Sequence, residues 1–241
     1  MAKVTAEVGV KISANEVAFK AALDRATSSI NKFENRLKNT ISVTGALSQA
    51  LGAFSVYEIT RQVINTTSEF QKLETVLGKT LGSSQLAAQS FEMITKFAQE
   101  SPYQVQELTN VFVRWANLGL SPSIEKMRML SDVASSLGAG FEQTGEAFKD
   151  LMVGQTKRLE EIGISAVQSN GKIQLSFKGV NIEIEKNAEG VMKALQTYSS
   201  LQGVQGASAA VMETLGGKTS NLNDKWTLLM YSIGQSTECL S

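Results

Sequence analysis

The sequence predicts a mainly α-helical protein, built as an elongated bundle of several helices with a small antiparallel β-meander around residues 164–184. Only two prolines occur in 241 residues, and both stand where helices are expected to begin. Apolar residues recur at intervals of three and four along most of the chain, and glycines divide this pattern into segments. One internal stretch changes to a two-residue period, which is typical of strands.

The composition argues against several classes of function. Lys and Arg together number 23 and equal Asp plus Glu, so no basic excess points to nucleic acid or to an anionic membrane. Histidine is absent, which removes the commonest general base and the commonest metal ligand. The single cysteine, Cys239, cannot form an internal disulfide or a multi-thiolate metal site. We therefore expect no catalytic, cofactor-binding or metal-binding residues.

Residues 1–64 form the first predicted region. Residues 3–12 alternate apolar and polar side chains, which predicts a strand, and Ser13-Ala14-Asn15-Glu16 is a capping box that opens a helix. Such a helix could form a coiled coil with another copy or a neighbouring helix, and equally could pack on its own domain. Its apolar row has heptad spacing, and we call it the self-association seam: Phe19, Leu23, Ala26, Ile30, Phe33 and Leu37.

A second helix is predicted from Leu47 through Val63, with a pattern that extends toward Leu77. It overlaps the most apolar window of the chain, residues 41–64. Glu58 and Arg61 interrupt that window, whereas a membrane span needs about 20 predominantly apolar residues. We therefore predict no membrane span here, and a helix that faces a partner or an interface.

Residues 65–235 form the second predicted region, in which glycines separate short helices. Ser101-Pro102 is predicted to be an N-cap followed by proline in the first turn, and Gln104 stands where a capping box needs it. That helix is expected to stop at Gly119. Ser121-Pro122 is expected to begin the next helix in the same way.

The chain after Gly140 predicts a helix that stops at Gly154 and then a short helical piece over residues 156–162. The mixed charges of that piece are typical of a solvated face, and an interface stays open. Asn170-Gly171 is a strong hairpin signal, and Lys178-Gly179 leads into a third alternating strand. Since a small sheet needs a hydrophobic partner, we expect it to rest on neighbouring helices.

The helical pattern returns after Lys186. A short helix is predicted to end at Gly216-Gly217, and Ser220-Asn221 is predicted to cap the last helix, which stops before Gly234. Residues 236–241 form a polar tail. The predicted apolar face of the last helix consists of Leu222, Trp226, Leu229 and Ile233.

Motifs that carry chemistry are weak in this sequence. Residues 78–80 and 217–219 both spell Gly-Lys-Thr, but neither has the full phosphate-loop spacing after a strand. Glu160 and Glu161 are adjacent on a predicted helix and so point in different directions. The two tryptophans, at positions 115 and 226, lie on apolar stripes and are predicted to be core residues.

Several segments nevertheless resemble one family in their order and spacing. Phe70-Gln71-Lys72-Leu73-Glu74 with Val76-Leu77-Gly78 and Leu81-Gly82-Ser83 resembles the start of the N-terminal domain of phage tail tape measure proteins. The resemblance covers about residues 10–235. Further matching segments are Asn117 to Ser121, Leu130-Ser131-Asp132-Val133-Ala134, Ala147 to Gly154, Arg158 to Ile164, Met212, Leu215 to Lys218 and Ser220 to Trp226.

The resemblance implies a structural role without catalysis. Proteins of this family act as an internal ruler whose length sets tail length, and tail tube subunits polymerise around them with help from tail assembly chaperones. It implies location in the virion tail, and in the host cytoplasm during assembly. Since the chain is too short to span a tail, we expect an N-terminal fragment or the product of a shortened gene, and one that forms homo-oligomers.

Two other interpretations stay open. The first is a helical coiled-coil adaptor unrelated to phage tails, which self-association without a tail tube partner would favour. The second is an enzyme whose site forms only on folding. A deep polar pocket with perturbed carboxylates would support the second interpretation.

Overall fold

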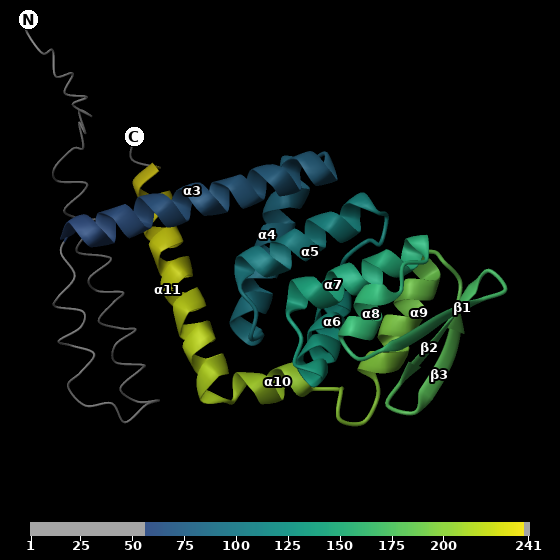
Figure 1. Cartoon of the computed structure of the whole chain (residues 1–241). Coiled ribbons are helices and arrows are strands. Elements are labelled where there is room, and N and C mark those ends of the chain that lie inside the picture. Colours follow the sequence, from purple (N-terminus) through teal and green to yellow (C-terminus); the bar gives the residue numbers. More distant parts are fainter. Residues whose placement is uncertain (1–55, 239–241) are drawn as a thin grey trace, which may run out of the picture. The chain divides into compact units, whose positions relative to one another are not determined.

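The computed structural model describes residues 56–238 (Figure 1). The predicted N-terminal strand, the helix with the self-association seam and the first part of the second helix lie outside the described residues. The chain divides into two compact units. The first contains the described residues 56–67 and 229–238, and the second consists of residues 68–228.

Two helices contribute to both units, α3 (Val56–Leu81) and α11 (Leu215–Glu238). Inside the first unit they touch closely at Gly234, where an added Cβ atom would lie 1.8 Å from Thr67 Oγ1. The prediction that the last helix stops before Gly234 is therefore wrong. The helix continues through Gly234. Glycine is present at this interior position because the approach of Thr67 leaves no room for a side chain.

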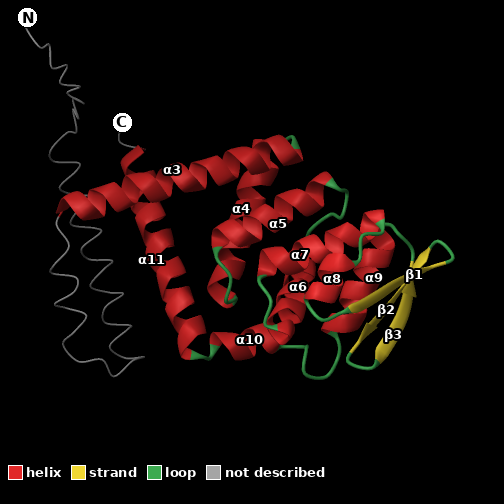
Figure 2. Cartoon of the chain, viewed as in Figure 1, coloured by secondary structure: helices red, strands yellow, loops and turns green. Residues whose placement is uncertain are grey.

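The second unit is mainly helical with one small sheet, as the sequence predicts (Figure 2). It also contains the adjoining parts of α3 and α11. Its complete elements are α4 (Ser84–Glu100), α5 (Val105–Asn117), α6 (Ile124–Leu137), α7 (Phe141–Asp150), η1 (Leu151–Val153), α8 (Lys157–Glu161), β1 (Ser165–Ser169), β2 (Lys172–Phe177), β3 (Val180–Ile184), α9 (Ala188–Ser199) and α10 (Ala207–Met212).

Trp115 lies at the centre of the packing between α5 and α7. It is fully buried, as predicted, and its indole Nε1 donates a hydrogen bond to the carbonyl oxygen of Gly145 at 3.1 Å. A Cβ atom on Gly145 would meet Val111 Cγ1 at 2.8 Å, so glycine lets the two helices approach. Large buried side chains from α6, α7 and α9 complete this core: Met127, Leu130, Phe141, Phe148 and Tyr198.

Replacing Trp115 should measurably weaken this unit. We expect Trp115→Phe to lower the free energy of unfolding by about 1–2 kcal/mol, because the hydrogen bond from the indole to the Gly145 carbonyl is lost and a small cavity forms. Urea unfolding followed by circular dichroism measures this. Trp226→Phe is the control, since Trp226 is only half-buried, and a larger loss for the control would contradict the prediction.

Two predicted helix starts are wrong by two or three residues. Ser101 is the C-cap of α4, and α5 begins at Val105 with Gln104 as its N-cap residue. The backbone N–H of Gln104 donates to the Glu107 carboxylate at 3.2 Å. Similarly, Ser121 has a positive φ of 44° in the connecting loop, and the hydroxyl of Ser123 caps α6. In both cases a second polar residue downstream competes for the capping position.

The predicted β-meander is confirmed. The sheet has the antiparallel order β1-β2-β3. Each hairpin turns through two residues with positive φ, first Asn170 and Gly171 and then Lys178 and Gly179. One face packs on α9, where the rings of Phe177 and Tyr198 meet edge to face at 5.3 Å. The buried residues of this face are Ala166, Ile173, Leu175, Phe177 and Ile184.

The start of α11 also differs from the prediction. The helix begins at Leu215, so Ser220 and Asn221 are interior residues rather than caps. A Cβ atom on Gly217 would lie 2.3 Å from the Val211 carbonyl oxygen, which explains why glycine is present without ending the helix. Both Gly-Lys-Thr sequences therefore lie inside helices, in α3 and α11, where they cannot form a phosphate-binding loop.

Candidate functional site

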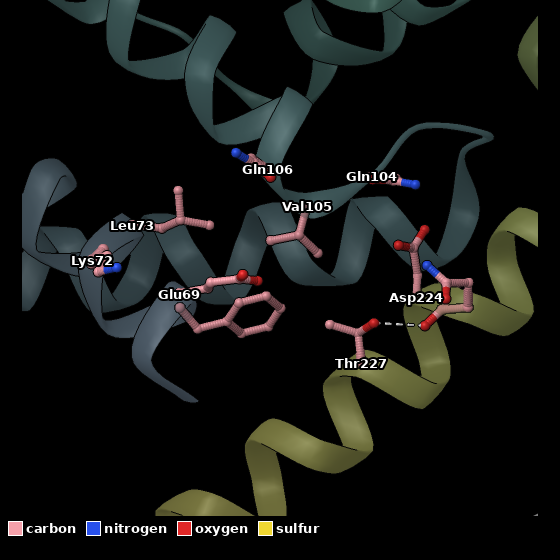
Figure 3. A pocket seen from close by; sticks show the side chains of 10 residues that line it. Glu69, Lys72, Leu73, Gln104, Val105, Gln106, Asp224 and Thr227 are labelled. Atoms are coloured by element: carbon pink, nitrogen blue, oxygen red, sulfur yellow. Dashed lines mark hydrogen bonds between the residues drawn. The ribbon is translucent and has the colours of Figure 1, made fainter. Parts of the chain in front are cut away.

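The predicted self-association seam lies outside the described residues, so the candidate site must be built from other side chains. The second unit contains a pocket with a volume of about 420 Å³ between α3, the start of α5 and α11 (Figure 3). Its walls combine apolar, amide and charged side chains. The lining residues are Glu69, Phe70, Lys72, Leu73, Gln104, Val105, Gln106, Asn223, Asp224 and Thr227.

Two walls of this pocket, α3 and α11, are held by contacts with α4 in the second unit. Phe70 of α3 meets Phe91 of α4 edge to face, with ring centroids 5.3 Å apart. Asn221 of α11 donates its side-chain amide to the carbonyl oxygen of Gln99, which lies in the last turn of α4 and has no partner within its own helix. These contacts anchor α3 and α11 on α4, next to the start of α5.

Asp224 is the unusual group in this pocket. It is only 3% exposed, and its Oδ2 atom has no hydrogen-bond partner. Its side chain points from α11 toward Gln104 (Figure 3). Burial raises the pKa of Asp224 to about 7, with a further contribution from the negative charge of Glu107. Asp224 can therefore change its charge near neutral pH.

The other polar groups of the pocket do not complete a catalytic arrangement. The hydroxyl group of Thr227 donates to the carbonyl oxygen of Asn223 at 2.8 Å, one turn earlier in α11, rather than to a base. Glu69 and Lys72 are both exposed and lie on α3. The ten lining residues therefore provide one buried acid without a paired nucleophile, which suits binding better than catalysis.

A second buried carboxylate, Asp132 of α6, has a structural role. Its Oδ2 atom accepts a hydrogen bond from the backbone N–H of Gly206 at 2.9 Å, and Oδ1 accepts one from the N–H of Ser208 at 3.0 Å. The Ser208 hydroxyl also donates to Oδ1. Gly206 is the N-cap residue of α10 and has no side chain to cap it. Asp132 supplies this cap from another helix.

A network of ion pairs joins α5, α7 and α8 around Glu146. Arg114 and Arg158 approach its carboxylate at 2.7 and 3.0 Å, and Lys149 donates to it as well. Burial alone would raise the pKa of Glu146, but the hydrogen bonds from Lys149 and Arg114 outweigh it and lower the pKa. Arg158 also pairs with Asp150 at 3.3 Å. The charges of the short helix are thus partly internal contacts, rather than only a solvated face.

The described residues 56–238 also bear on membranes and metal ions. No helix in that part of the chain is long and apolar enough to cross a membrane. Within the same residues, no group of three or more His, Cys, Asp or Glu side chains is placed to hold a metal ion.

Sequence reasoning missed both buried aspartates. Between Gly216 and Leu228, the buried residues of α11 are Gly217, Asn221 and Asp224, at spacings of four and three. The predicted apolar face is wrong there, because Leu222 and Trp226 are only half-buried. The helical spacing of these small and polar residues was the available signal, but an apolar pattern alone does not select them.

The comparisons with known proteins give consistent matches. The family model for tape measure proteins matches residues 61–235. The Mu-like prophage FluMu protein gp42 of Haemophilus influenzae is 23% identical over 224 residues, which cover 85% of this chain. The matched part is 34% of that relative, so the chain spans about a third of its length. No solved structure matches the chain.

Proposed function

The chain belongs to the tape measure protein family, and on this premise we propose that it acts as the tape measure that sets the length of a phage or prophage tail. The family match and the prophage relative connect the chain with phage tails. The observation that carries the proposal is that the match extends from residue 61 to residue 235 and so includes the whole second unit.

The proposed role is structural and non-enzymatic. A helix rises about 1.5 Å per residue, so the length of a helical chain translates directly into distance. The mainly helical structure of the described residues fits this principle. The chain would serve in the host cytoplasm as a template on which tail tube subunits assemble with tail assembly chaperones, and would then remain in the virion tail. As a segment of a longer ruler, it would contribute its share of the length.

The ruler role predicts a measurable change in tail length. Inserting about 60 helix-forming residues after Ser241 in the source gene should lengthen the tails by about 90 Å, because each helical residue adds about 1.5 Å. Electron microscopy of purified tails measures the length, and mass spectrometry of the same tails detects peptides from residues 61–235.

A matched control adds the same number of residues as a compact domain in the turn at Lys178-Gly179, which connects β2 and β3. That insertion adds mass at one end of strands β2 and β3 without extending a helix, so tail length should not change. Normal-length tails that contain the helical insertion would contradict the ruler role. Tails without any peptide of this chain would contradict a place in the tail.

A further inference from the structure

We propose that the pocket between α3, α5 and α11 binds an organic cation, an ammonium or guanidinium group attached to a short aliphatic chain. Two sources present this chemistry, a lysine or arginine side chain of a partner polypeptide and a free polyamine. This inference goes beyond the ruler role and does not depend on it, because it rests only on side chains within residues 68–228.

The unpartnered carboxylate oxygen of Asp224 is the first argument. An acceptor that is buried without a hydrogen bond is costly, so native proteins rarely leave one without a partner. Asp224 lines the pocket and is almost fully buried, yet its Oδ2 atom has no hydrogen-bond partner. A cationic N–H donor that enters the pocket would supply both the missing hydrogen bond and the compensating charge.

The charges around the pocket favour a cation over an anion. Glu69 and Asp224 line it, and Glu107 lies close enough to Asp224 to raise its pKa. Lys72 is the one positively charged lining residue, and its side chain is exposed. The start of α5 would by itself favour an anion. However, Glu107 in its first turn already supplies that negative charge, because its carboxylate accepts a hydrogen bond from the backbone N–H of Gln104.

The shape and lining of the pocket favour an organic cation over a bare metal ion. Phe70, Leu73 and Val105 form apolar walls, which suit the methylene groups of a lysine or arginine side chain or of a polyamine. Hard metal ions instead prefer several oxygen ligands. The volume of about 420 Å³ is also far larger than a single ion needs.

Binding of a cation should be coupled to release of a proton. Burial and the negative charge of Glu107 raise the pKa of Asp224 to about 7, whereas a nearby positive charge favours the ionised carboxylate. Below that pH the ligand must displace a proton, so affinity should rise as the pH increases from 6 to 8. Calorimetry in buffers with different ionisation enthalpies measures the number of protons released.

The test uses the whole chain and a set of small probes. Isothermal titration calorimetry at pH 8 compares two blocked tripeptides, Gly-Arg-Gly and Gly-Lys-Gly, with the neutral Gly-Gln-Gly and with putrescine and spermidine. We expect the cationic probes to bind and the neutral tripeptide to bind at least about tenfold more weakly. Preference for the tripeptides would indicate a polypeptide partner, and preference for the polyamines would indicate a free ligand.

Two substitutions with opposite expected effects decide the assignment. Asp224→Asn keeps the size of the side chain but removes its charge. It should weaken the binding of the cationic probes about tenfold or more. Lys72→Gln removes the competing positive charge and should strengthen the binding of the cationic probes about two- to threefold. Circular dichroism checks that both variants fold. Equal affinity of wild type and Asp224→Asn, or no binding of any cationic probe to the folded wild type, would overturn the proposal.

Discussion

Asp132→Ala should lower the free energy of unfolding of the second unit by about 3–4 kcal/mol, because hydrogen bonds to a charged group contribute about 1.5–3 kcal/mol each and their donors remain behind without partners. The carboxylate accepts from the N–H groups of Gly206 and Ser208 and from the Ser208 hydroxyl. These contacts join α6 to the start of α10 across 74 and 76 residues of the sequence.

Urea unfolding measures the overall effect, and hydrogen exchange locates it. The amides of Gly206 and Ser208 should lose protection in Asp132→Ala before the amides of α5 do, because they lose their acceptor directly. Ser208→Ala removes one of the three donors and should cost only about 1 kcal/mol. Combined with Asp132→Ala it should add almost nothing, since the two residues share the same contact.

A matched control comes from the same helix. Glu125 of α6 is exposed, and Glu125→Ala should change the free energy of unfolding by less than about 1 kcal/mol. A similar cost for Glu125→Ala and Asp132→Ala would show that removing any negative charge from α6 is responsible. In that case the cap on α10 would not be the reason for burying Asp132.

Local signals in the sequence predicted the parts of the fold that local geometry decides. The turn at Asn170 and Gly171 needs two positive φ angles, and the sequence provides residues that adopt them. The stop at Gly119 is correct for the same reason, since its φ is 75°. Such positions depend on a few neighbouring residues and not on the rest of the fold.

Contacts between distant segments decided the remainder, and they left weak traces in the sequence. Gly217 and Gly234 resemble helix stops, but both are interior residues whose missing side chains allow another segment to approach. Asp132 and Asp224 resemble surface residues, because Asp is rarely buried unless it is paired. Their burial follows from partners or walls supplied by other helices, which a pattern along one helix does not reveal.

Asp224 should make the second unit less stable as the pH rises from about 4 to about 7. The pKa of Asp224 is about 7 in the folded protein, against an ordinary value of 3.8. Between these values the folded state retains a proton that the unfolded state has lost, so stability falls with increasing pH. Each pKa unit corresponds to about 1.4 kcal/mol, so the total effect is about 4 kcal/mol.

Asp224→Asn isolates this contribution, because asparagine does not titrate. The variant and the wild type should be similarly stable at pH 4, and the variant should be more stable by about 3–4 kcal/mol at pH 8. Urea unfolding at intervals of half a pH unit gives both curves, and their difference removes the contributions of other acids such as Glu146. Glu69→Gln, which removes an exposed carboxyl group from the same pocket, should give a difference curve without this slope.

The direction of the pH effect also separates an occupied pocket from an empty one. A bound organic cation stabilises the ionised Asp224 carboxylate, so saturating amounts of the best-binding probe should flatten the wild-type curve between pH 4 and 7. The same probe should leave the pH dependence of Asp224→Asn unchanged, because asparagine does not titrate. If the difference between wild type and variant instead changed only below pH 4, or did not change between pH 4 and 8, the pKa of Asp224 would not be raised in the folded protein. The carboxylate would then have a partner in solution.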